Sequence, residues 1–152
     1  MTKERFTELV LASEQTLYRV SMSMLKNEAD CQDAVQTAIL TAYEKLSDLK
    51  KEEFFKTWLV KILINTCHKQ LRFRSKHTEL SEDLPTDSDD SVKEVRDAVN
   101  RLPDKIRQVV VLYYIEGFSV KEIRQIIKIP EGTIKSRLSK GRDLLRVHLS
   151  ES

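Results

Sequence analysis

Apolar side chains recur every three or four residues along most of the chain. In the first segment they are Phe6, Leu9, Val10, Leu17, Val20, Met24 and Leu25. This spacing places them on one face of a helix over about residues 4–26, and the sequence predicts further helices over about residues 30–46 and 53–76. Only 3 Gly and 3 Pro occur in 152 residues, too few for the many turns of a β-sandwich or β-barrel. The sequence therefore predicts an all-α fold.

Charge is distributed unevenly, although the formal net charge is only +2. Residues 1–76 hold 13 basic and 10 acidic side chains, residues 77–97 hold 2 and 8, and residues 98–152 hold 11 and 6. The segment 77–90 contains Pro85 and few apolar residues, so we expect an acidic flexible linker there. It separates two small helical domains, residues 1–76 and 91–152, whose positive charge suits polyanions. An ordinary solvated surface with an acidic linker would have the same charges.

No catalytic arrangement stands out in the sequence. The three histidines have no neighbouring ligand partners, and there is no glycine-rich phosphate loop. Cys31 and Cys67 lack the CxxC spacing of a zinc site, so we expect both to be reduced core residues. The longest uncharged run, residues 34–43, is too short to cross a bilayer. We expect a non-enzymatic, cytoplasmic protein without cofactor, metal or small-molecule substrate.

Helix-start signals divide the C-terminal domain into four helices. Ser91-Val-Lys-Glu94 matches a capping box for a helix that ends near residue 101, and Pro103 suits the first turn of a helix that ends near Gly117. Ser119-Val-Lys-Glu122 is a second capping box. The helix that it starts is broken at Lys128-Ile-Pro130, and another helix begins at Glu131. Two helices joined by so short a turn form a helix-turn-helix, whose second helix fits the major groove of DNA.

The last helix is predicted to have one apolar face and one donor-rich face. The apolar face consists of Ile134, Leu138, Gly141 and Leu145. The opposite face consists of Ser136, Ser139, Lys140 and Asp143, flanked by Lys135, Arg142 and Arg146. Such side chains can hydrogen-bond to bases and phosphates. A helical hairpin with a solvated basic face is the alternative.

The helix over residues 53–76 carries a basic arc. Six side chains fall within about 100° of one another, namely Lys61, Asn65, His68, Lys69, Arg72 and Lys76. Phe54 and Trp58 are predicted to project along the same arc. Cations interleaved with aromatic rings are typical of surfaces that bind single-stranded nucleic acid. Alternatively, Phe54 and Trp58 are core residues and the arc is only a solvated face.

The helix over residues 30–46 is polar on one side and apolar on the other. Its polar arc consists of Asp33, Gln36, Thr37, Leu40, Thr41 and Glu44, opposite Ala34, Val35, Ala38, Ala42 and Leu46. Leu40 is the one large apolar side chain in the polar arc. An apolar residue ringed by polar ones is typical of the centre of a protein interface, although a single exposed Leu is also common.

The order of these segments resembles the extracytoplasmic-function (ECF) sigma factors of bacterial RNA polymerase across nearly the whole chain. Region 4 is matched by Leu102-Pro103, Arg107-Gln-Val-Val-Val-Leu112, Gly117-Phe-Ser-Val-Lys-Glu-Ile123 and Ile129-Pro-Glu-Gly-Thr-Ile-Lys-Ser-Arg-Leu138. Region 2.2 is matched by Asp33-Ala-Val-Gln36 and Ala42-Tyr43, and region 2.3 by Phe54 to Asn65.

This resemblance implies a transcription initiation factor that binds core RNA polymerase and directs it to promoters. Region 2 would dock on the clamp helices of the largest subunit through Asp33, Gln36, Thr37, Leu40 and Tyr43. The minus-ten element would be opened and held by Lys51, Phe54, Lys56, Trp58, Lys61, Asn65, His68, Lys69 and Arg72, with the loop at residues 49–53 against the exposed strand. The minus-thirty-five element would be read by Thr133, Lys135, Ser136, Arg137, Ser139, Lys140 and Arg142.

The resemblance also implies further partners. Region 4 would contact the flap of the second-largest subunit, and the acidic linker would thread the polymerase channel that RNA later occupies. Members of the family are commonly held inactive by an anti-sigma factor, often bound to the membrane, that hides their polymerase-binding faces.

The chain departs from the family pattern at several positions, and the Arg-Ala-Arg string of the family is Lys140-Gly-Arg142 here. Thr37 stands where the family usually has an acidic residue, so we expect an altered affinity for polymerase, and Lys69 stands where Asp is frequent. Arg124 replaces a small residue, which would put a polar group near a packing position. Gly141 replaces the Ala of an Arg-Ala-Arg string and would weaken a helix interior.

Two other readings fit parts of the sequence. A stand-alone helix-turn-helix repressor or activator would dimerise and bind a palindromic operator without polymerase. It leaves the basic arc and the acidic linker unexplained. A helical adaptor without DNA binding would use its apolar faces only for protein contacts and would be indifferent to nucleic acid and to salt.

Overall fold

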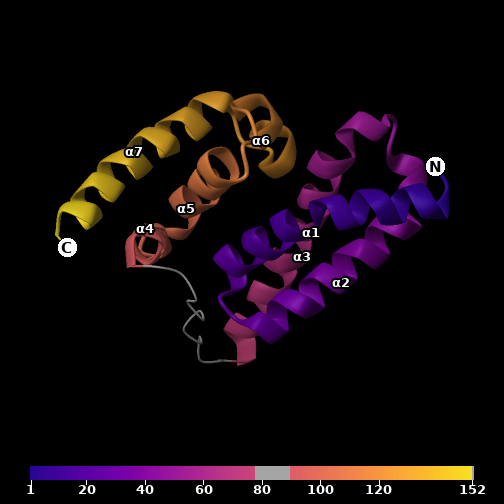
Figure 1. Cartoon of the computed structure of the whole chain (residues 1–152), viewed down its shortest axis with the longest axis horizontal. Coiled ribbons are helices and arrows are strands. Elements are labelled where there is room, and N and C mark those ends of the chain that lie inside the picture. Colours follow the sequence, from indigo (N-terminus) through magenta and orange to yellow (C-terminus); the bar gives the residue numbers. More distant parts are fainter. Residues whose placement is uncertain (78–89, 152) are drawn as a thin grey trace. The chain divides into compact units, whose positions relative to one another are not determined.

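A computed structural model describes residues 1–77 and 90–151, and every regular element within them is helical. The all-α prediction is confirmed. The acidic segment at residues 77–90 lies almost entirely outside the described residues. The chain divides into two compact units, Met1–Asp83 and Leu84–Ser152, with the boundary inside this segment (Figure 1).

The N-terminal unit consists of three long helices that all pack against one another: α1 (Lys3–Leu25), α2 (Glu28–Glu44) and α3 (Phe55–His77). Short 3-10 turns at Leu46–Asp48 and Glu52–Phe54 lie in the connection from α2 to α3. The prediction that Leu46 lies on the second helix is therefore wrong, because α2 ends two residues earlier. Phe54 likewise precedes α3.

Side-chain caps define where the first two helices begin. The Thr2 hydroxyl accepts a hydrogen bond from the Arg5 backbone N–H at 3.0 Å, and the Asn27 side chain accepts one from the Asp30 N–H at 2.9 Å. Each satisfies a donor that the first helical turn leaves unpaired. Lys26 ends α1 in the left-handed conformation, with φ of 56°, and so turns the chain from α1 into α2 within two residues.

Small side chains let α2 approach both of its neighbours. The buried residues of α2 are Cys31, Ala34, Ala38 and Ala42, and none of them is exposed to solvent. The larger side chains of this core come from α1 and α3, including Leu17, Leu25, Phe55, Leu59 and Leu63. The small residues form the face of α2 that is buried in the unit. The opposite face of α2 is left for contacts with partners outside the unit.

Both cysteines are free and buried, as expected. Burial raises the pKa of the Cys67 thiol to about 12, with a smaller contribution from nearby Cys31. The folded protein therefore keeps a proton that the unfolded thiol, with its ordinary pKa near 9.0, releases.

Stability of the N-terminal unit is consequently expected to fall as pH rises above about 9 toward 12. Urea unfolding followed by the fluorescence of Trp58, the only tryptophan, measures this trend. Cys67→Ala is the control, because its dependence on alkaline pH should be shallower. An equal dependence in both proteins would contradict the prediction.

The C-terminal unit consists of α4 (Asp90–Asn100), α5 (Asp104–Val110), a π-helical turn (Val111–Ile115), α6 (Val120–Ile127) and α7 (Glu131–Ser150). α7 packs against α4, α5 and α6. α4 already includes Asp90, so Ser91 lies inside its first turn and not before it as predicted. α5 is followed by the π-helical turn, and the chain then turns at Gly117, whose φ is 80°.

Arg107 is a buried clamp that the sequence did not predict. Its side chain is only 5% exposed and donates hydrogen bonds to the Leu102 carbonyl at 2.8 Å and to Asp104 Oδ1 at 2.6 Å. A longer bond of 3.5 Å reaches the Asn100 carbonyl at the end of α4. The guanidinium thus joins the end of α4 to the start of α5 by satisfying carbonyls that no helix pairs.

Gly141 of α7 lies directly against side chains of α5. A Cβ at this position would lie 2.6 Å from Val110 Cγ2 and 3.2 Å from Ile106 Cγ2. The expectation that Gly141 only weakens a helix interior is therefore incomplete, because the missing methyl group allows this contact. The prediction that Arg124 puts a polar group near a packing position is also wrong. Its side chain is 62% exposed, and Arg124 Nη1 lies 3.9 Å from Glu131 Oε2.

Candidate functional site

The helix-turn-helix forms as the sequence predicts. Ser119 and Glu122 make both bonds of the capping box at the start of α6, at 3.1 and 2.9 Å. α6 ends at Ile127, Lys128 turns the chain with φ of 56°, and α7 begins at Glu131. The turn between α6 and α7 is thus the three residues Lys128-Ile-Pro130, and one side of α7 is exposed at the surface of the unit.

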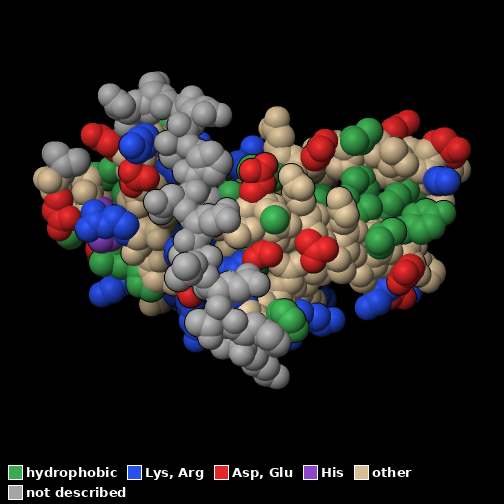
Figure 2. Space-filling view, turned by 90° about the horizontal axis from the view of Figure 1, so that it is seen from below, with side chains coloured by type: hydrophobic (Ala, Val, Ile, Leu, Met, Phe, Trp, Pro, Cys, Tyr) green, Lys and Arg blue, Asp and Glu red, His purple; other side chains and the backbone are tan. Residues whose placement is uncertain are grey.

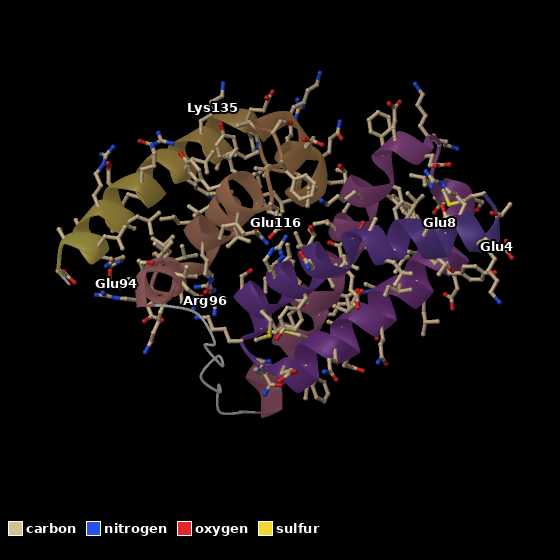
Figure 3. The ribbon with its side chains drawn as sticks, in the orientation of Figure 1. Glu4, Glu8, Glu94, Arg96, Glu116 and Lys135 are labelled. Atoms are coloured by element: carbon tan, nitrogen blue, oxygen red, sulfur yellow. The ribbon has the colours of Figure 1, made fainter. Side chains whose placement is uncertain are left out.

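The two faces of α7 separate as predicted. Ile134, Leu138 and Gly141 are buried, and Leu145 is half-buried. Of the predicted DNA-contacting residues, five are exposed, namely Lys135, Ser136, Ser139, Lys140 and Arg142, whereas Thr133 and Arg137 are half-buried at the edges of the face. Lys135 points away from α5, near the start of α7 (Figure 3). The exposed side is therefore rich in hydrogen-bond donors.

Two arginines on this face already have partners. Arg142 Nη1 donates a hydrogen bond to the hydroxyl of Tyr114 at 3.0 Å, and Arg146 Nη1 lies 3.3 Å from Asp143 Oδ1. Tyr114 belongs to the π-helical turn and was missed by the sequence analysis. No signal in the sequence relates it to Arg142, because the two lie 28 positions apart.

The basic arc of α3 is exposed over most of its length. Asn65, His68, Lys69 and Arg72 are exposed, and Lys61 is half-buried, whereas the side chain of Lys76 lies outside the described residues. Lys51 and Lys56, near the start of the helix, are exposed as well. Within Phe55–His77 the sequence has six Lys and Arg and no Asp or Glu. This helix therefore presents a strongly positive surface.

The two aromatic residues of the predicted arc differ in position. Trp58 is half-buried on α3, with its ring 6.0 Å from that of Phe55. Phe54 is 50% exposed, so it is not a core residue. It lies in the 3-10 turn before α3, and the helical angle used to place it on the arc does not apply there. The exposed ring is instead carried by the loop.

His68 differs in charge from its basic neighbours. Although His68 is exposed, part of its ring is shielded from water, and this desolvation, together with the positive charge of Arg72, lowers the pKa of His68 below its ordinary value of 6.5. The imidazole is therefore neutral at pH 7 and can hydrogen-bond or stack, but it adds no positive charge to the arc.

The loop before α3 is tied to the N-terminal end of α1. Arg5 Nε and Nη2 both reach Glu52 Oε1, at 2.6 and 2.5 Å, and Arg5 Nη1 reaches Glu8 Oε2 at 2.9 Å. These two carboxylates raise the pKa of Arg5 above its ordinary value. The ring of Phe6, the next residue, packs edge to face against the rings of Tyr43 and Phe55, with centroids 5.2 and 5.7 Å apart. The loop that carries Phe54 is thus braced from α1.

α2 presents an acidic face with an apolar centre. Asp33, Gln36 and Thr37 are exposed, as are Leu40 and Tyr43 at 64% and 48%. α2 contains four acidic residues and no Lys or Arg. Figure 2 shows acidic side chains in red, with hydrophobic ones in green between them, over the visible face of the N-terminal unit at the right of the view. A partner for this face needs apolar and neutral or basic groups.

A groove of about 550 Å³ runs between the acidic and the basic helix. Asp33, Thr37 and Thr41 of α2 line it together with Asn65, Lys69 and Phe73 of α3. Gln70 crosses it, since its amide donates to Asp33 Oδ2 at 3.1 Å, and an ion pair between Arg74 and Asp30 lies at one end. Residues predicted to bind polymerase and residues predicted to bind DNA therefore border one groove.

Residues 1–77 and 90–151 contain no group of three or more His, Cys, Asp or Glu side chains that could hold a metal ion. None of the helices in these ranges is both long enough and apolar enough to cross a membrane.

Comparison with known families matches both units. Residues 9–77 match the family described as sigma-70 region 2, and residues 93–145 match the family described as sigma-70, region 4. The first match covers α2, α3 and most of α1, and the second covers the helix-turn-helix.

Similarity to individual relatives extends over nearly the whole chain. The ECF RNA polymerase sigma factor SigW of Bacillus subtilis is 28% identical, over 98% of this chain and 91% of its own length. The RNA polymerase sigma factor SigV of the same organism is 28% identical, over 99% and 98%. Among solved structures, the sigma factor RpoE of Bartonella quintana, determined in complex with the anti-sigma factor NepR, is 25% identical with a TM-score of 0.85, over 97% of this chain and 98% of its own.

Proposed function

The chain belongs to the ECF sigma factors of the sigma-70 family, which are transcription initiation factors, and we propose that it docks on core RNA polymerase through α2 and contacts promoter DNA through α3 and α7. Region 4 would in addition meet the polymerase flap. Since polymerase and promoters are in the cytoplasm, the protein would act there.

One observation carries this proposal: neighbouring helices of a single unit have opposite charge. α2 has four acidic and no basic residues, whereas α3 has six Lys and Arg and no acidic residue. A single kind of partner would suit only one of these faces. A nucleic-acid strand suits α3, because Lys and Arg neutralise phosphates and Phe54 offers a ring for stacking. A protein suits α2, with Leu40 and Tyr43 as its apolar anchors.

The groove between α2 and α3 supports adjacent docking of the two partners. Asp33 and Thr37 on one wall would face polymerase, and Asn65 and Lys69 on the other wall would face the exposed strand. DNA opening would then occur beside the polymerase surface. The brace from Arg5 to Glu52 would hold Phe54 and Lys51 ready at the end of the basic arc.

Two weak DNA-binding units become specific when they are joined on one polymerase. α7 would read the minus-thirty-five element as a duplex while α3 and its loop hold the minus-ten strand. Binding by one unit raises the effective concentration of the other near its element. Phosphate contacts make this binding dependent on salt, and a few base contacts contribute about 1–3 kcal/mol each to sequence choice.

An anti-sigma factor is proposed as the regulator. The Bartonella relative was solved in complex with one. In this chain such a partner would act by covering the acidic and apolar face of α2, which would block docking on polymerase.

Lys140→Ala is expected to weaken recognition of the minus-thirty-five element about 5- to 150-fold, as the loss of a base contact worth about 1–3 kcal/mol implies. Lys140 is exposed on α7, so the fold should be unaffected. Initiation is measured on promoters with and without the element, with Lys105→Ala, an exposed lysine of α5, as control. An equal loss on both promoters would remove Lys140 from this role.

In-vitro transcription tests the proposal as a whole. Fragmented bacterial genomic DNA is transcribed by core RNA polymerase of the same host, with and without the purified protein, and RNA 5′ ends are sequenced. New start sites that share two upstream motifs are expected. No new start with an active core would contradict the proposal; binding of a palindromic site by a dimer alone would then indicate a repressor, and indifference to DNA would indicate an adaptor.

A further inference from the structure

A hydrogen bond between Tyr114 and Arg142 links the π-helical turn to the exposed side of α7. Arg142 Nη1 donates to the Tyr114 hydroxyl oxygen at 3.0 Å. Both residues are exposed, Tyr114 by 49%, so burial does not force them together. A long surface arginine otherwise samples many rotamers, and holding it in one of them costs conformational entropy. The hydrogen bond therefore indicates that the orientation of Arg142 matters for a function of this surface.

The π-helical turn brings Tyr114 to this place. Its wider hydrogen bonding, from the Glu116 N–H to the Val111 carbonyl at 2.9 Å, leaves three consecutive side chains exposed, namely Tyr113, Tyr114 and Ile115. The ring of Tyr113 meets that of Tyr114 edge to face, with centroids 4.9 Å apart. Tyr114 is thus held by a ring contact on one side and a hydrogen bond at its tip. Such single π-helical turns occur frequently at functional sites.

Arg142 stands in a basic stripe along α7. At the helical angle of about 100° per residue, Lys135, Ser139, Arg142 and Arg146 share one side of the helix. The stripe spans about 16 Å, since α-helical residues rise about 1.5 Å each. Lys135 is near the start of the helix, where base contacts are made in helix-turn-helix proteins, and Arg142 is two turns further along. Its position suits the phosphate backbone at the rim of the groove.

We propose that Tyr114 is a positioning residue that aims Arg142 at a phosphate of the DNA backbone. The bond to Tyr114 uses one of the five N–H donors of the guanidinium and leaves Nε and Nη2 to form a fork against phosphate oxygens. The entropy of ordering Arg142 is then lost on folding and not on binding. This inference rests on the proposed function, since it requires α7 to meet duplex DNA.

The test uses holoenzyme reconstituted from the full chain and core polymerase, with a promoter found in the transcription experiment. Promoter affinity is measured at several salt concentrations for Tyr114→Phe, Arg142→Ala and the double variant. Tyr113→Phe is the matched control, because its ring is retained and Tyr113 makes a ring contact with Tyr114. Thermal unfolding and affinity for core polymerase are measured for every variant.

Tyr114→Phe is expected to weaken promoter binding about three- to tenfold, the effect of losing one ordinary hydrogen bond, because this bond is exposed to solvent. The factor should be the same on random-sequence duplex, because a phosphate contact carries no sequence information. Arg142→Ala should bind still more weakly and reduce the slope of log affinity against log salt by about 0.9. The double variant should equal Arg142→Ala within about twofold, since Tyr114 acts through Arg142.

Three results would overturn the inference. Tyr114→Phe could bind DNA as well as the wild type, its effect could multiply with that of Arg142→Ala, or it could weaken core polymerase binding instead of DNA binding. Each leaves the proposed function standing when the wild-type holoenzyme recognises its promoter. A wild-type protein that directs no promoter binding contradicts both.

Discussion

Replacing Gly141 by Ala is expected to destabilise the C-terminal unit by about 1–3 kcal/mol, the usual cost of overpacking a dense core. The added methyl would lie 2.6 Å from Val110 Cγ2, and Val110 is 1% exposed and β-branched, so it cannot swing away. Ala is the better helix former by up to about 1 kcal/mol, so propensity alone predicts the opposite sign. At position 141 the clash with Val110 outweighs the helix propensity of Ala, so the free energy of unfolding is expected to fall.

The two units provide separate signals for this measurement. Trp58 is the only tryptophan and lies in the N-terminal unit, so its fluorescence follows that unit, whereas circular dichroism follows helices of both. Gly141→Ala should lower the denaturant midpoint seen by circular dichroism and leave the Trp58 midpoint unchanged. A loss of minus-thirty-five recognition should accompany it, because α7 is displaced from α5.

Two further variants make the Gly141 prediction sharp. Gly132→Ala, also in α7, has no neighbour within 4 Å of the added methyl and should be neutral or stabilising. Val110→Ala removes the clashing methyl groups, so the double variant with Gly141→Ala should be more stable than the sum of the two single effects. A stable Gly141→Ala protein, or strict additivity with Val110→Ala, would mean that α5 and α7 do not meet at this distance.

Leu40→Asp is expected to weaken binding to core RNA polymerase by about 30-fold or more, which corresponds to roughly 2 kcal/mol. Leu40 is 64% exposed, so the substitution removes no core packing and should leave the unfolding midpoint unchanged. The loss would come from the apolar anchor and from a further negative charge on a helix that is already acidic. Affinity for core polymerase is measured directly in solution.

Leu11→Asp is the matched control for Leu40→Asp. Leu11 has nearly the same exposure, 62%, but lies on α1 outside the α2 face. Polymerase affinity should fall for Leu40→Asp alone, and DNA contacts by α7 should be unaffected. Unchanged affinity in Leu40→Asp would remove Leu40 from the interface, and equal losses in both variants would place the interface elsewhere on the unit.

Local patterns predicted most of the helices and the turn between α6 and α7. The capping box of Ser119 and Glu122 involves residues three positions apart, and both of its bonds form. The buried face of α7 follows from periodicity within one helix. The predictions for Leu46 and Phe54 were wrong because the angle of about 100° per residue was applied beyond the ends of α2 and α3. Both residues lie in 3-10 turns, where this angle does not hold.

The sequence by itself determined the helical class, the opposite charges of α2 and α3, and the donor-rich face of α7, because these depend on residue types and on spacings of three and four. Only the tertiary structure decided the contacts between distant positions. The need for glycine at position 141 comes from Val110, the brace on the loop comes from Arg5 and Glu52, and the orientation of Arg142 comes from Tyr114. Each pair lies 28 to 47 positions apart, beyond the reach of helical periodicity, and is brought together only when the helices pack.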